Sequence, residues 1–181
     1  YEWVEVNARK RPESKDKRKE SYEPASSPEF ERKGKVGTKN HWEERKRIIL
    51  PMASQSIEHL YEKYKKDWTS LGIVKPARVD DVIVTAEDAE WSPQHRTLFQ
   101  QPRLFGQQQK LLQKCNHRFS YSFKCDDIAC KGHKMQILDW GLSWLYLKLR
   151  EKEGEPSAIQ KTKEKCWEMA SDDRDTWFYV G

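Results

Sequence analysis

Residues 119–140 have the sequence FSYSFKCDDIACKGHKMQILDW, which predicts a strand, a metal-binding turn and the start of a helix in direct succession. Phe119, Tyr121 and Phe123 alternate with polar or charged residues, the period of two of a strand with one aromatic face. After the turn, apolar residues recur every three or four positions up to about residue 151, as in an amphipathic helix. The stretch is therefore expected to form one continuous strand, turn and helix.

The turn holds a candidate zinc site. Cys125, Cys130 and His133 are spaced so that two thiolates and an imidazole can converge on one tetrahedral ion, and Gly132 allows the tight bend between them. Upstream, Cys115 and His117 complete the pattern C-x-H-x7-C-x4-C-x2-H, which offers five donors where Zn²⁺ needs four. We expect Cys115 as the fourth ligand, with His117 as the first alternative and a residue from elsewhere in the chain or a water after it. The competing interpretation is that the cysteines are small buried residues that bind no metal.

Carboxylates beside the turn suggest a second chemistry. The carboxylates of Asp126, Asp127 and Asp139 could bind Mg²⁺ for phosphodiester cleavage, and Lys124 or Lys134 could stabilise the developing charge. Such acids also commonly orient a ligating histidine or cap the next helix, so a structural role stays open.

The motifs resemble those of a known family. The pattern F-x-Y-x-F-x-C-D-D-x-x-C-x-G-H, the following D-W, the closing D-T-W-F-Y-V-G and the upstream S-L-G-I-V-K-P at 70–76 resemble a family of uncharacterised bacterial and archaeal proteins. The resemblance covers about residues 68–181, and the family extends further at both ends. It implies a common core and no particular activity. Gly141 departs from the family's acidic residue, and Cys115 and His117 lie outside its pattern.

Composition limits the class of protein. The chain is 36% hydrophobic and 35% charged, so its 21 aromatic residues must supply much of the core. No apolar run is long enough to span a membrane, and four scattered cysteines argue against a secreted disulfide scaffold. We therefore predict a cytoplasmic protein without a membrane partner. Nucleotide-binding glycine loops, G-x-S-x-G and H-E-x-x-H are all absent from the sequence.

The order of patterns predicts a small α+β fold: a small mixed sheet, several helices and the zinc-knuckle-like strand, turn and helix. Residues 1–86 form an N-terminal region of strands and helices with a charged loop at 9–33. Residues 87–113 are expected to be a linker or long loop, and 114–181 to carry the knuckle, two helices and a terminal strand, in one domain with 1–86. In the helix expected after a cap at Ser54 or Ser56, an apolar stripe from Ile57 to Trp68 is interpreted as core.

Charge supports a functional hypothesis. The chain has 34 Lys and Arg against 29 Asp and Glu, which is compatible with nucleic acid. The leading prediction is a zinc-stabilised protein that binds DNA or RNA, with the aromatic strand stacking bases. The alternatives are a protein-interaction subunit of a larger complex and a metal-dependent nuclease. The candidate nucleic-acid contacts are Arg9, Lys10, Arg11, Arg118, Lys124, Lys131 and Lys134.

Overall fold

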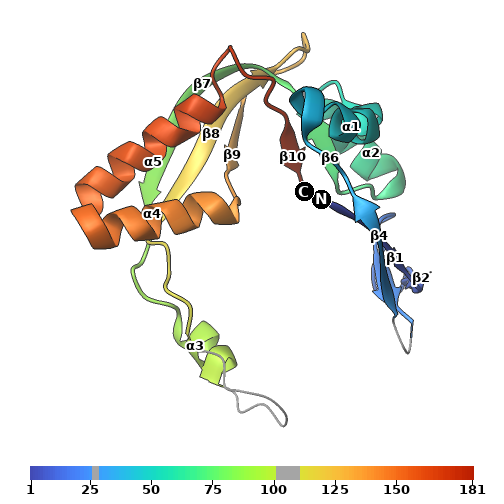
Figure 1. The fold of residues 1–181 in the computed structure, drawn as a ribbon, viewed down its shortest axis with the longest axis horizontal. Coiled ribbons are helices and arrows are strands. Elements are labelled where there is room, and N and C mark those ends of the chain that lie inside the picture. The colour runs from blue at the N-terminus through green and yellow to red at the C-terminus, as the bar shows by residue number, and fades with distance from the viewer. Residues whose placement is uncertain (26–28, 101–110) are drawn as a thin grey trace. The chain divides into compact units, whose positions relative to one another are not determined.

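The computed structural model describes residues 1–25, 29–100 and 111–181. This part of the chain forms an α+β fold with five α-helices and several small sheets, as the sequence predicted (Figure 1). It divides into two compact units. Unit 1 comprises Tyr1–Arg78, Lys124–Lys131 and Thr176–Gly181, and unit 2 comprises Val79–Phe123 and Gly132–Asp175.

Unit 1 begins with two antiparallel ribbons. Strand β1 (Glu2–Val6) pairs with β4 (Phe30–Lys35), and β2 (Ala8–Lys10) pairs with β3 (Tyr22–Pro24). The predicted loop at 9–33 therefore contains strands. Its mixed charges are matched across the pairing, because Arg9 lies 2.6 Å from Glu23 on the opposite strand.

The rest of unit 1 surrounds a mixed three-stranded sheet. Helix α1 (Lys39–Ile49) and the short 3-10 helix η1 (Leu50–Met52) lead into β5 (Ala53–Ser54), α2 (Ile57–Asp67) and β6 (Gly72–Val74). Strand β6 lies at the centre, parallel to β5 and antiparallel to β10 (Phe178–Val180). Its residues Ile73 and Val74 are buried and form the core of this sheet.

Helix α2 differs from its predicted packing. Ile57 and Leu60 are half-buried, as a core-facing stripe requires. Tyr61, Tyr64 and Trp68, which continue the same stripe, are exposed. The interpretation of the whole stripe as core is therefore wrong for its three aromatic rings.

Unit 2 packs two helices on a sheet. Strands β7 (Pro76–Ala86, in this unit from Val79), β8 (His117–Cys125) and β9 (His133–Gln136) form the sheet in that order, and helices α4 (Trp140–Glu153) and α5 (Glu155–Met169) cover one face of it (Figure 1). The aromatic face of β8 meets these helices. The Phe119 ring lies 5.8 Å from the Tyr146 ring, and the Tyr121 hydroxyl donates to the Cys166 carbonyl at 2.9 Å.

The predicted linker at 87–113 contains a further helix, α3 (Pro93–Gln100). Ser92 precedes the helix, and its hydroxyl accepts a hydrogen bond from the His95 backbone N–H at 3.3 Å, as an N-cap does. Pro93 then occupies the first helical position, where the missing N–H costs nothing. The prediction of a loop at 101–110 lies outside the described residues.

Candidate metal centre

The metal-binding turn closes through its own hydrogen bonds. At the end of β8, the Cys125 backbone N–H donates to the Cys130 sulfur at 3.2 Å, and the Cys130 N–H donates to the Asp127 carbonyl at 3.0 Å. Gly132 follows with a φ of 95°, a left-handed conformation that favours glycine. These bonds turn Cys125 and Cys130 toward one another.

Helix α2 supplies the other wall of the site. Ser56 caps the helix by accepting a hydrogen bond from the His59 N–H at 3.1 Å, and its hydroxyl donates to the Asp127 carboxylate at 2.6 Å. Gln55 donates to the Asp126 carbonyl at 3.4 Å. Glu58 lies in the first turn of this helix, so the contacts that dock the helix on the turn also bring Glu58 to it.

Four side chains converge here. One donor atom each from Glu58, Cys125, Cys130 and His133 lies within 4.8 Å of all the others. A tetrahedral ion with bonds of about 2.0–2.3 Å separates its donors by about 3.3–3.8 Å, so the four atoms need only small shifts to bind one. The cluster can therefore hold a metal ion.

Burial and proton chemistry fit metal binding. Cys125 is buried, and this burial raises the pKa of its thiol. Without a cation the thiol keeps its proton at neutral pH, whereas a bound metal would displace that proton. All four cysteines of the chain lie in the described part, and none of them forms a disulfide.

Cys115 and His117 lie elsewhere. The Cys115 thiol donates to the His117 carbonyl at 3.1 Å, and the His117 ring nitrogen Nδ1 lies 2.8 Å from the Tyr146 hydroxyl. Among the described residues the donor group contains neither of them and has Glu58 instead. Sequence spacing missed Glu58 because it lies far upstream of Cys125. The nearest sequence signal was the predicted cap at Ser54 or Ser56, which placed Glu58 near the start of a helix.

The three aspartates proposed for catalysis do not form one donor group in the described structure. Asp127 accepts hydrogen bonds from Ser56 and from the Ala129 N–H at 2.9 Å. Asp139 caps α4 by accepting from the Leu142 N–H at 2.8 Å. Asp126 is exposed. The structural alternative, carboxylates that order a turn and cap a helix, describes Asp127 and Asp139.

The predicted nucleic-acid contacts of β8 and of the turn after it lie in different environments. The rings of Phe119, Tyr121 and Phe123 are buried, so they cannot stack on bases. Phe119 packs against Tyr146 of α4, and Tyr121 is hydrogen-bonded to Cys166 of α5. Arg118 pairs with Glu87. Lys124, Lys131 and Lys134 are exposed.

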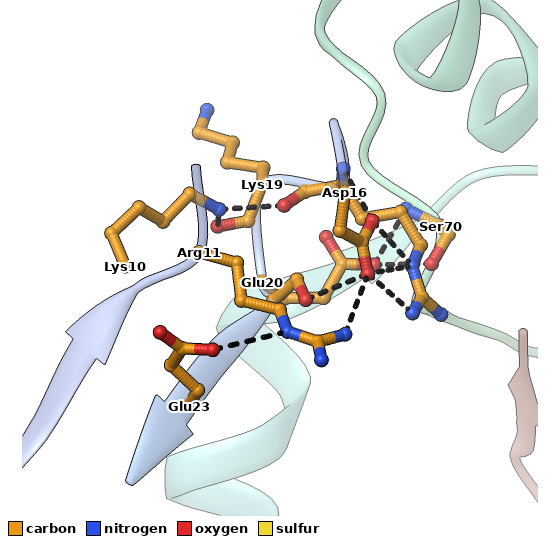
Figure 2. A network of polar contacts seen from close by, with 9 residues as sticks. Lys10, Arg11, Asp16, Lys19, Glu20, Glu23 and Ser70 are labelled. Carbon is orange, nitrogen blue, oxygen red and sulfur yellow. Dashed lines mark hydrogen bonds and ion pairs between the residues drawn. The ribbon is translucent and has the colours of Figure 1, made fainter. Parts of the chain in front are cut away.

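The basic residues of β2 and its neighbourhood belong to a polar network within unit 1 (Figure 2). The Lys10 ammonium donates to the carbonyls of Arg18 and Lys19, both at 2.5 Å. Arg11 lies 3.7 Å from Glu23 and 3.9 Å from Asp16. With Arg9 paired to Glu23, these cations order the hairpin, and their contact with nucleic acid stays a prediction.

Comparisons with known proteins give families without an assigned activity. A family model described as Domain of unknown function (DUF8757) matches residues 53–181, and a second, Domain of unknown function (DUF8758), matches residues 1–51. No curated protein and no solved structure matches the chain. Among residues 1–25, 29–100 and 111–181, no helix combines the length and apolar character that crossing a membrane requires.

Proposed function

Because the chain belongs to the family described as Domain of unknown function (DUF8757), we propose its function from its own residues: unit 1 is a nucleic-acid-binding module stabilised by Zn²⁺. The metal would bind Cys125, Cys130, His133 and Glu58. Two thiolates favour Zn²⁺ over Mg²⁺ or Ca²⁺, which prefer oxygen ligands. Four protein donors leave no open position for a substrate, so the role of the metal is structural.

The observation that carries the proposal is the distribution of charge. Unit 1 has 21 Lys and Arg against 15 Asp and Glu, whereas unit 2 has 13 against 14. The whole basic excess of the chain therefore belongs to the unit that contains both cysteines of the metal cluster. A local positive excess attracts the phosphate backbone and increases the rate of association with it.

A binding titration tests this proposal. The zinc-loaded chain is titrated with single-stranded and duplex DNA and with RNA, at low and at high potassium chloride. Binding should weaken steeply with salt, because each phosphate contact releases a condensed counterion. Absence of binding, or binding that salt does not change, contradicts the proposal.

A second candidate function is a protein-interaction subunit, which the β1–β4 ribbon favours. Every residue of both strands is exposed, including Trp3 at 53% and Phe30 at 66%. Two-stranded ribbons are marginally stable in water unless a further element covers one face. Light scattering on the isolated chain, compared with a Trp3→Lys variant, tests whether the ribbon mediates association.

The proposed site also bears on localisation. Thiolate ligands must stay reduced, and the cytoplasm keeps them so. We therefore assign the protein to the cytoplasm. Loss of Zn²⁺ when the purified protein is exposed to an oxidant would support the need for a reducing compartment.

A further inference from the structure

We propose that helix α2 carries a base-stacking platform for single-stranded nucleic acid, formed by Tyr61, Tyr64 and Trp68. The inference rests on the proposed function and names the form of nucleic acid that unit 1 selects. The three rings lie at spacings of three and four residues, so they share one face of the helix. They are 57%, 39% and 42% exposed, which leaves a stripe of aromatic surface in water.

The geometry of the rings suits flat ligands. The Tyr64 and Trp68 rings are 5.4 Å apart and inclined at 75°. A base stacked on the face of one ring would therefore meet the edge of the other, and two such contacts would hold it in one orientation. Stacking of this kind tolerates any sequence, because every base presents an aromatic face.

Cations accompany the rings. The Lys17 ammonium lies 5.0 Å from the centre of the Trp68 ring, and the Lys65 ammonium lies 4.3 Å from that of Tyr61. Lys66 is exposed on the same helix turn as Lys65. Two acids are also near: Glu62 pairs with Lys65 at 3.2 Å and Asp67 pairs with Lys19 at 3.0 Å. The four lysines named here outnumber the two acids, so the phosphates of a stacked strand would meet positive charge beside the rings.

The backbone at Trp68 is a second observation that favours a functional ring. Trp68 ends α2 with a φ of 61°, the left-handed conformation that glycine adopts most easily at this position. A bulky side chain there is uncommon and destabilises the folded state relative to glycine. A strained residue at an exposed surface is a reason to look for a function of its side chain.

Duplex nucleic acid does not fit this surface equally well. The bases of a duplex are stacked on one another and expose only their edges, so exposed ring faces cannot reach them. Single strands present unstacked bases at no such cost. The platform therefore predicts preference for single strands, whereas simple charge attraction by unit 1 predicts none.

The test uses the complete zinc-loaded chain, with oligo(dT), oligo(U) and a DNA duplex of the same length as probes. Trp68→Gly removes the ring and relieves the backbone strain, so thermal unfolding should confirm that the variant folds. Affinity for single strands should fall about 5- to 150-fold, and Trp68→Phe should restore most of it. The salt dependence should stay unchanged in Trp68→Gly and should weaken when Lys65 and Lys66 are both replaced by Ala.

Trp144 provides a matched control. It is 53% exposed on α4 and has a lysine ammonium, that of Lys148, 4.9 Å from its ring, but it belongs to unit 2. Trp144→Ala should leave single-strand affinity unchanged. Three results would overturn the platform: Trp68→Gly binds single strands as tightly as the unmodified chain, Trp144→Ala loses as much affinity as Trp68→Gly, or the unmodified chain prefers duplex. If binding still weakens with salt in these cases, the proposed function stands. Absence of any binding by the unmodified chain overturns both.

Discussion

The hydroxyl of Ser56 donates a hydrogen bond of 2.6 Å to the carboxylate of Asp127, 71 residues further along the chain. The same hydroxyl accepts from the His59 N–H and so caps α2. The hydrogen bond from the Ser56 hydroxyl holds the pKa of Asp127 below its usual value, with a smaller effect from the Ala129 N–H. One buried serine thus joins the start of α2, which carries Glu58, to the turn that carries the two cysteines.

Ser56→Ala should therefore weaken folding and metal binding together. Loss of the cap and of one hydrogen bond to a charged group predicts a decrease of about 1–3 kcal/mol in the free energy of unfolding. Chemical denaturation measures this decrease, and competition with a chromophoric chelator measures zinc affinity. Ser92→Ala removes the cap of α3 and should leave zinc affinity unchanged. Equal zinc affinity in Ser56→Ala and the unmodified chain would show that Ser56 does not position the site.

Gly72→Ala should destabilise unit 1. A Cβ atom at Gly72 would lie 2.2 Å from one methyl carbon of Leu60 and 2.9 Å from its Cγ, which is too close for the two side chains to coexist without movement. Overpacking of this kind costs about 1–3 kcal/mol. Gly34→Ala is the matched control, because a Cβ there meets no atom within 4 Å. If both variants unfold at the same denaturant concentration, the contact between α2 and β6 is looser than the distances imply.

The sequence predicted the elements whose pattern is local. Alternating rings identified β8, and recurring apolar residues identified α4 and α5, because each signal repeats several times within one element. Strands β6 and β9 escaped prediction. They are three and four residues long, so neither contains enough repeats for a period to be recognised. Each is held by pairing instead, β6 with the remote strand β10 and β9 with the preceding strand β8.

The sequence also predicted those donors of the candidate site that lie close together in the chain, because their spacing is a local signal. Cys125, Cys130 and His133 share one turn, whereas Glu58 arrives through the docking of α2 and has no fixed spacing from them. The prediction that the stripe from Ile57 to Trp68 is core was wrong for a different reason. The helical period of the stripe is the same whether a face meets the core or solvent, so periodicity located the face correctly without telling what covers it.

Cys166 should make stability fall at alkaline pH. Its side chain is fully buried, and burial raises the pKa of the thiol from 9.0 to about 11. The unfolded chain therefore releases this proton first, and the contribution of Cys166 is complete below pH 9 and lost as pH rises through about 11. The loss should reach about 3 kcal/mol at most. Burial also raises the pKa of Tyr121, which adds a loss of the same sign at higher pH.

Denaturation of the unmodified chain and of Cys166→Ala across this range isolates the contribution of the thiol. The variant begins less stable because it leaves a small cavity, so the slope with pH carries the information rather than the stability itself. A shallower slope in Cys166→Ala is expected between pH 9 and 11. Parallel slopes would mean that the thiol is more accessible to water than its burial indicates.

The last prediction concerns the metal itself. Cys125→Ser and Cys130→Ser should each release Zn²⁺ and destabilise unit 1, because the unfolded chain has no preformed site and binding energy contributes directly to folding. Glu58→Gln should retain the fold and weaken zinc affinity by about tenfold or more, since the amide is a poorer ligand than a carboxylate. Elemental analysis and chelator competition give both quantities, and a chelator should lower the unfolding temperature of the unmodified chain.

Two controls separate ligation from general damage. Glu62→Gln changes an acid one helical turn after Glu58 that is exposed and pairs with Lys65, so it should leave zinc affinity unchanged. Cys166→Ala removes a buried thiol outside the cluster and should likewise keep the metal. Zinc retained in Cys125→Ser would contradict the assignment outright. Zinc lost equally in Glu62→Gln and Glu58→Gln would mean that charge near the turn, and not coordination by Glu58, sets the affinity.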